Sequence, residues 1–84
     1  MIPPEWKNQN ERELTVEQVK RLEPGTKITV ISADRYGECR RTDCTVAQSG
    51  RKKVLIHRDP GTWEKLVSPI REDKNRMYVI RKGA

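Results

Sequence analysis

The chain has 84 residues, its 18 Lys and Arg outnumber its 12 Asp and Glu to give a net charge of +6, and only four residues are aromatic. This length allows one domain at most, and a large enzyme pocket is not expected in so small a core. No apolar run approaches the ~20 residues of a membrane span, and the first six residues lack the basic start and apolar stretch of a signal peptide. We therefore expect a small cytoplasmic domain without a membrane segment.

The first segment, residues 1–13 (MIPPEWKNQNERE), contains two prolines, two asparagines and few apolar groups. Such a segment buries too little surface to offset the entropy lost on ordering it, so we predict a flexible tail over 1–13. Trp6 is the exception, and we expect its ring to dock on the folded body because large aromatic side chains are usually well buried. The folded domain is predicted to cover 14–84.

The strongest local signal predicts a helix over 15–22. Thr15 suits the N-cap position, and Gln18 three residues later completes the pattern of a capping box. Leu14 and Val19 then occupy the two positions of a hydrophobic staple. At under three turns this helix would not be stable alone, so its apolar stripe must pack on the rest of the domain.

Strand-like patterns follow the helix. Val and Ile dominate the apolar residues, and β-branched side chains favour strands because they pack well on a pleated surface. The predicted strands span 26–33, 38–47, 51–58 and 76–82, while residues 63–67 fit either a short strand or one helical turn. Pro-Gly pairs predict type II turns at Glu23–Thr26 and at Asp59–Thr62.

This order of elements predicts a mainly β fold with a short N-terminal helix. Four or five short strands at close spacing suggest a curled antiparallel sheet or a small barrel. By strand count and turn spacing, residues 25–82 resemble the SH3-like barrels, a class that includes Tudor and KOW domains. An OB-like barrel is less favoured, because that fold usually needs a longer chain and a helix between its third and fourth strands. Both folds serve many functions, so function has to be argued from individual residues.

The residues that most often perform catalysis or bind metals are few. His57 is the only histidine, and general acid–base chemistry needs a second group positioned against it. Cys39 and Cys44 pair with no third partner at a recognisable catalytic spacing, and a structural zinc site needs four ligands, usually in close pairs. Five positions apart on a straight strand, the two cysteines point to opposite faces, so we predict one buried and one exposed thiol. We expect no enzymatic activity, no cofactor and no metal.

In the second predicted strand, the alternation of side chains gives each face a different chemistry. The residues expected to point inward are Cys44 and Val46, and those expected to point outward are Arg41, Asp43 and Thr45.

The strongest functional signal is the distribution of positive charge. Residues 1–24 carry four basic and five acidic side chains, whereas residues 25–84 carry fourteen basic and seven acidic ones. A diffusing polyanion would therefore be attracted to the strand region. The basic clusters there are Arg40 and Arg41 on the second strand and Arg51, Lys52 and Lys53 at the start of the third.

If these strands form a hairpin through Gly50, the two clusters lie on one connected strip, and counting outward from the turn places Arg41, Thr45, Arg51 and Lys53 on one solvent face. Such a strip would neutralise phosphates and release counterions, and Arg suits phosphate through its bidentate fork. Tyr36 at a loop tip, and Tyr78 if it faces the strip, would stack on bases. The sequence therefore predicts a small non-enzymatic module that contacts the backbone of DNA or RNA.

Other readings of the same residues remain open. Lys and Arg also protect edge strands and keep small domains soluble, and Glu38, Asp43 and Asp59 would partly neutralise them. The alternative function is a protein-interaction module, an inhibitor or regulator that docks on an acidic surface of a larger protein. It would act by strand addition or by using Trp6 as an anchor.

Recognition of methylated Lys or Arg by an aromatic cage would need three rings to converge. The rings available in the body of the domain are those of Tyr36, Trp63 and Tyr78. We instead expect Tyr36 and Trp63 to cover the ends of a thin barrel.

Overall fold

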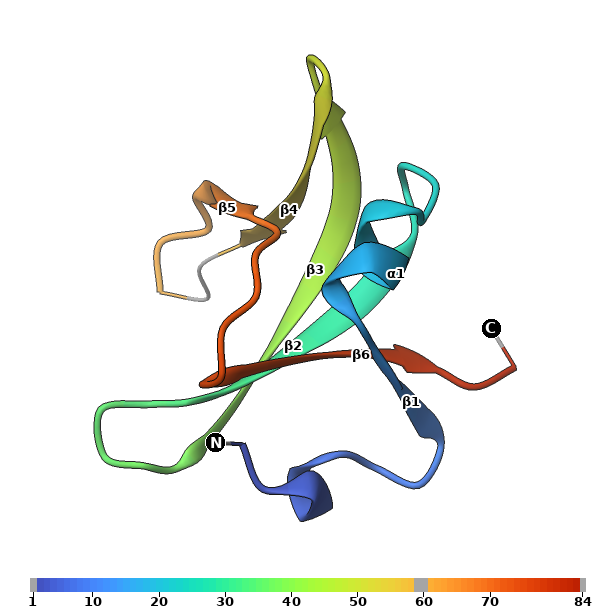
Figure 1. Ribbon diagram of the computed structural model, residues 1–84. Helices are drawn as coiled ribbons and strands as arrows, with labels where there is room; N and C mark the ends of the chain where they lie inside the picture. Colours follow the sequence, from blue (N-terminus) through green and yellow to red (C-terminus); the bar gives the residue numbers. More distant parts are fainter. Residues whose placement is uncertain (1, 59–60, 84) are drawn as a thin grey trace.

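The computed structural model describes residues 2–58 and 61–83, and its six antiparallel strands form one open sheet in the order β1-β6-β2-β3-β4-β5 (Figure 1). The elements in chain order are a 3-10 helix at Pro4–Trp6, β1 Glu11–Leu14, α1 Val16–Lys20, β2 Lys27–Ala33, β3 Cys39–Ser49, β4 Lys52–Arg58, β5 Lys65–Pro69 and β6 Arg76–Arg81. The predicted mainly β fold with a short N-terminal helix is confirmed. The sheet is curled and does not close into a barrel. No helix within the described residues is long and apolar enough to cross a membrane.

The N-terminal segment differs most from the prediction, because the described part of 1–13, which was expected to form a flexible tail, is folded onto the sheet. Ile2 is buried, the 3-10 helix follows it, and β1 pairs with β6 along the register Glu11 to Arg81. Trp6 packs against a cluster that contains Ile2, so its predicted docking on the folded body is confirmed. The N-terminal segment is ordered because it packs against residues of β6 and β2, which lie far along the chain. No local pattern within the segment reveals these packing partners.

The helix begins as predicted and ends two residues earlier. Thr15 Oγ1 accepts a hydrogen bond from the Gln18 N–H at 3.1 Å, and Gln18 Oε1 accepts one from the Thr15 N–H at 2.9 Å, which confirms the capping box. The chain then tightens, because the Leu22 N–H donates to the Val19 carbonyl rather than to the Gln18 carbonyl, the acceptor of a continuing α-helix. Gly25 follows with φ +96°, the conformation that a type II turn requires. The second predicted turn, Asp59–Thr62, lies partly outside the described residues.

Apolar side chains gather on both faces of the sheet. On the face that carries α1, called the helix face below, the larger core consists of Leu14, Val19, Ile28, Val30, Cys44, Val46, Leu55, Ile70 and Tyr78. On the opposite face, Ile2, Ile31, Met77 and Val79 form a smaller core with Trp6 packed against it. In Figure 1, α1 and the N-terminal segment accordingly lie on opposite sides of β6. The predicted inward direction of Cys44 and Val46 is confirmed.

Strand β3 changes its partner in the middle. It pairs with β2 from Cys39 to Thr45, and with β4 from Thr45 to Ser49. Beyond Thr45, β4 continues beside β5 and diverges from the first half of β3 (Figure 1). Within the described residues, the first half of β3 therefore has a strand partner on one side only.

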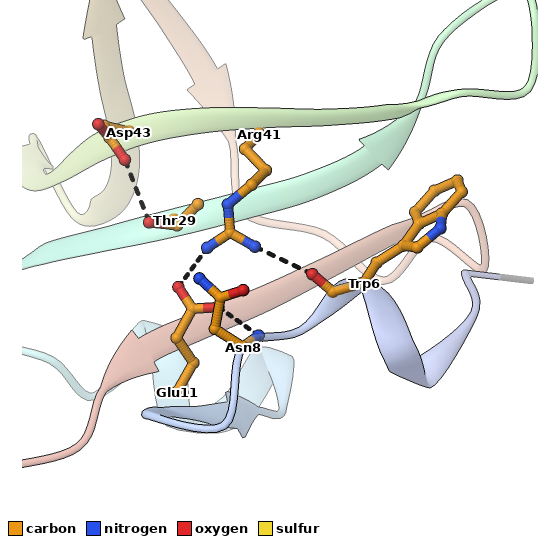
Figure 2. A network of polar contacts seen from close by, with 6 residues as sticks. All are labelled: Trp6, Asn8, Glu11, Thr29, Arg41 and Asp43. Atoms are coloured by element: carbon orange, nitrogen blue, oxygen red, sulfur yellow. Dashed lines mark hydrogen bonds and ion pairs between the residues drawn. The ribbon is translucent and has the colours of Figure 1, made fainter.

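Polar contacts fasten the N-terminal segment to β3 (Figure 2). The Arg41 guanidinium forms an ion pair with Glu11 and donates a hydrogen bond to the Trp6 carbonyl at 3.0 Å. Glu11 is only 7% exposed, and its other carboxylate oxygen accepts a hydrogen bond from the Asn8 N–H at 2.9 Å. A buried carboxylate needs such partners, because leaving a charge unpaired away from water is costly.

Replacing Arg41 tests this attachment. We expect R41A to lower the free energy of unfolding by about 1–3 kcal/mol, because the buried Glu11 carboxylate loses its counterion. Urea denaturation measures the loss. In R41A/E11Q the loss should be smaller than the sum of the two single losses, since the uncompensated charge is gone.

The control for this measurement is R40A, which removes an exposed neighbour of the same type and should change stability by less than about 0.5 kcal/mol. Equal losses in R41A and R40A would contradict a structural role for the Arg41 ion pair.

Candidate functional site

The predicted basic residues fall into two groups at opposite ends of β3. Arg40 and Arg41 lie near its start, and Arg51, Lys52 and Lys53 follow its end. Arg40 and Ser49 are nine positions apart along an extended chain, which is roughly 30 Å at the rise of a β-strand. The prediction of one connected strip is therefore wrong.

The two faces of the β3–β4 hairpin also differ from the prediction. Ser49 lies opposite Lys52 and Gln48 lies opposite Lys53, so an odd-numbered position of β3 shares its face with an even-numbered position of β4. Lys52 consequently lies on the face of Thr45, and Lys53 lies on the helix face. The expectation that Arg41, Thr45 and Lys53 share a face is wrong. The register of the hairpin determines which positions of β3 and β4 share a face, and this register cannot be read from the sequence alone.

The group at the start of β3 is only partly available for a ligand. Arg40 is exposed on the helix face, but Arg41 is occupied by Glu11 and by the Trp6 carbonyl. Tyr36 is 77% exposed at the tip of the β2–β3 turn, with the Arg35 guanidinium carbon 5.3 Å from its ring centroid. The Asp34 carboxylate fixes this turn by accepting hydrogen bonds from the N–H groups of Tyr36 and Glu38.

The other aromatic residues do not join Tyr36. Tyr78 is only 3% exposed, and its hydroxyl donates to the Arg71 carbonyl at 3.0 Å, so it belongs to the core and offers no stacking surface. Trp63 is 74% exposed. The expectation that Tyr36 and Trp63 cover the ends of a barrel is wrong, since the open sheet leaves both rings in solvent. A cage of the three predicted rings is excluded by the burial of Tyr78.

The group at the end of β3 surrounds a hollow of about 510 Å³, called the hairpin hollow below. It is lined by Lys20, Gln48, Arg51, Lys52, Lys53, Val54, Pro69 and Ile70. Four of these side chains are cationic, and no acidic side chain among residues 2–58 and 61–83 lines the hollow. Lys20, Arg51 and Lys52 are exposed, so their charges are open to a ligand.

The sequence missed Lys20 as a member of this group, because only the packing of α1 over the hairpin brings it there. Its place in the last turn of the predicted helix gave no sign of this contact. Lys53 connects the hairpin to this helix, because its ammonium donates a hydrogen bond to the carbonyl of Leu22 just beyond α1. Gln48 stays within the hairpin and donates to the Gly50 carbonyl at 2.7 Å.

The thiols and the histidine lie on different parts of the fold. Cys39 is exposed and Cys44 is buried, as the sequence predicted. Burial, assisted by the nearby Asp43 carboxylate and opposed by the Arg76 cation, raises the pKa of the Cys44 thiol to about 11. His57 shares a hydrogen bond of 3.1 Å with the Ser68 hydroxyl. Within residues 2–58 and 61–83, no group of three His, Cys, Asp or Glu side chains is arranged to hold a metal ion.

Comparison of the chain with protein-family models, with curated proteins and with solved structures gives no match. The hypotheses below therefore depend on the geometry and charge of the described residues.

The two thiols should differ in reactivity. Cys39 is exposed, whereas Cys44 is buried and its raised pKa of about 11 keeps its thiol protonated at pH 9. Because the thiolate is the reactive form, we expect Ellman's reagent to modify Cys39 quickly and Cys44 only after unfolding in guanidinium. The variant C39S should show no fast reaction, and two fast thiols in the native protein would contradict the burial of Cys44.

Proposed function

We propose that the protein is a small non-enzymatic module that binds the backbone of DNA or RNA at the hairpin hollow. The observation that carries this proposal is the grouping of Lys20, Arg51, Lys52 and Lys53 around one hollow that no acidic side chain of the described part of the chain lines. Four cations around one hollow, with Lys53 on the helix face and Lys52 on the opposite face, produce a stronger local potential than the same charges spread over the whole surface, and they attract a polyanion.

The chemistry of the four cations suits phosphate. Arg51 lies at the turn of the hairpin, where an exposed guanidinium can contact a phosphate through two parallel hydrogen bonds. Lys20 and Lys52 add charges on flexible stems, so the hollow can adapt to the spacing of successive phosphates. The hydrogen bond of Lys53 to the Leu22 carbonyl limits its movement and leaves its charge in place.

The lining of the hollow offers no surface for base stacking and therefore little basis for sequence preference. No aromatic side chain lines it, and Tyr36 lies at the other end of β3. Phosphate contacts position a protein without reading sequence, so we expect little sequence preference. The affinity should depend strongly on salt, since it comes mainly from the release of counterions.

Fluorescence anisotropy with labelled 20-nucleotide DNA and RNA, single- and double-stranded, tests the proposal at several salt concentrations. We expect micromolar affinity at low salt, and the logarithm of the association constant should fall with the logarithm of salt at a slope of about −3. R51Q/K52Q should weaken binding at least about tenfold and reduce the slope by about two.

The matched control is R81Q/K82Q, which removes the same charge from exposed positions at the end of β6. We expect this variant to lose less than about threefold in affinity, because these residues do not line the hollow. Equal losses in the two variants would show that net charge alone drives binding. Absence of binding at low salt would overturn the proposed function.

A further inference from the structure

The two outer edges of the sheet are protected against further strand pairing. In β5 the backbone groups of Lys65, Val67 and Pro69 point away from β4, since those of Ser68 and Leu66 face it. Proline has no N–H to donate, and a charged side chain also discourages pairing, so this edge is short and blunted. At the other edge, the outward positions of β1 are Glu11 and Glu13.

The first half of β3 contains no proline that would block pairing, although its outward positions, Arg41 and Asp43, are charged like those of the outer edges. The backbone groups of Val46 and Glu38 are hydrogen-bonded on the side of β2, to Thr26, Gly25 and Asp34. By the alternation of an antiparallel ladder, the N–H and C=O groups of Arg41 and Asp43 point the other way. They project toward the space where β4 diverges, and within the described residues no strand pairs with them there.

This space is a groove of about 620 Å³, called the β3 slot below. Its lining residues are Arg40, Arg41, Thr42, Asp43, Thr45, Ile56, His57, Arg58, Lys65 and Leu66. A smaller hollow of about 250 Å³ adjoins it on the helix face, where Arg40, Thr42 and His57 line both spaces and Arg76 adds a further cation. The slot is therefore reached from both faces of the sheet.

The charges around the slot favour an anionic ligand. Arg40, Arg58 and Lys65 are exposed cations that line it, and the register places Arg58 opposite Lys65 across β4 and β5. Asp43 is the acidic side chain in the lining, and its carboxylate accepts a hydrogen bond of 3.2 Å from the Thr29 hydroxyl. Among the described residues that line the slot, three exposed cations thus outnumber one carboxylate.

We propose that the β3 slot binds an extended acidic segment of a partner protein, which adds to β3 as a further strand. Its backbone would pair with the N–H and C=O groups of Arg41 and Asp43, and its acidic side chains would face Arg40, Arg58 and Lys65. A protein strand fits the slot better than a nucleic acid does, because only a peptide repeats donors and acceptors at the spacing of a β ladder. This interaction is separate from the binding proposed at the hairpin hollow.

Isotope-labelled full-length protein and a synthetic octapeptide of alternating Thr and Glu test the proposal by NMR titration. We expect binding, with amide hydrogen exchange of Arg41 and Asp43 slowed at least about tenfold in the complex, as new backbone hydrogen bonds require. The Glu13 amide on the outer edge of β1 should be unaffected. The same peptide with alternate backbone nitrogens methylated keeps its charge and should bind at least about tenfold more weakly.

Variants of Asp43 distinguish the contribution of its backbone N–H to peptide binding from that of its side-chain charge. D43P removes the same carboxylate as D43N and, in addition, an N–H that points into the slot, so it should bind the peptide about threefold to tenfold more weakly than D43N does. D43N keeps the N–H, loses the repelling carboxylate and should bind the peptide more tightly. The control is E13P, which places proline at an outward position of β1 and should leave peptide binding unchanged. If D43P fails to fold, the exchange measurement and the methylated peptide still decide.

Three outcomes would overturn the proposal. Equal binding of the peptide and its methylated form would show attraction by charge alone. Unchanged exchange at Arg41 and Asp43 in the complex would place the peptide elsewhere. Binding of an oligonucleotide that is lost in R58Q/K65Q and retained in R51Q/K52Q would assign the slot to nucleic acid. Failure of the peptide to bind leaves the anisotropy result for the hairpin hollow untouched, so the two proposals fail separately.

Discussion

The constraint on which the rest of the structure depends is that β3 is shared between two partners. It has eleven residues, whereas β2 and β4 have seven each, and the ladders meet at Thr45. Adjacent strands in a sheet are rotated relative to one another, so a long strand between two shorter ones carries its partners apart. Both candidate sites follow from this geometry, because the hairpin hollow lies beyond the second half of β3 and the slot lies beside the first half.

Strand β3 also anchors the N-terminal segment, and it uses one of its own cations to do so. Arg41 looks like a phosphate ligand in the sequence, yet its guanidinium joins Glu11 and the Trp6 carbonyl to β3 (Figure 2). Its role is to hold the segment that covers Ile31 and Val79 on the opposite face. A count of Lys and Arg therefore overstates the charge that a ligand can use, and only the cations that are not neutralised by an internal carboxylate support a binding site.

What the sequence predicted well depends on local physics. The capping box of Thr15 and Gln18 forms between residues three apart, and the alternation of Cys44 and Val46 is a property of one strand. What it predicted poorly depends on distant partners. The ordering of β1 requires β6, the face of Lys53 requires the register of the hairpin, and the burial of Tyr78 requires α1 and the loop that holds Arg71. The ends of β2, β3, β4 and β6 were predicted to within two residues, whereas β1 was not predicted and β5 was left open between a strand and a helical turn. The side on which each side chain meets another element was not visible from the sequence.

The separation of the two candidate sites has a consequence for how they would act together. Asp43 and Ser49 are six residues apart on β3, so the slot and the hairpin hollow are separated by roughly 20 Å. At about 0.1 M salt the Debye length is about 10 Å, so an acidic segment in the slot would only weakly reduce the potential at the hollow. Coupling between the two sites would then have to be transmitted through the backbone of β3 and its hydrogen bonds to the neighbouring strands. Because Thr45 pairs with both β2 and β4, a strand added to the first half of β3 would stiffen the residue at which the two halves join.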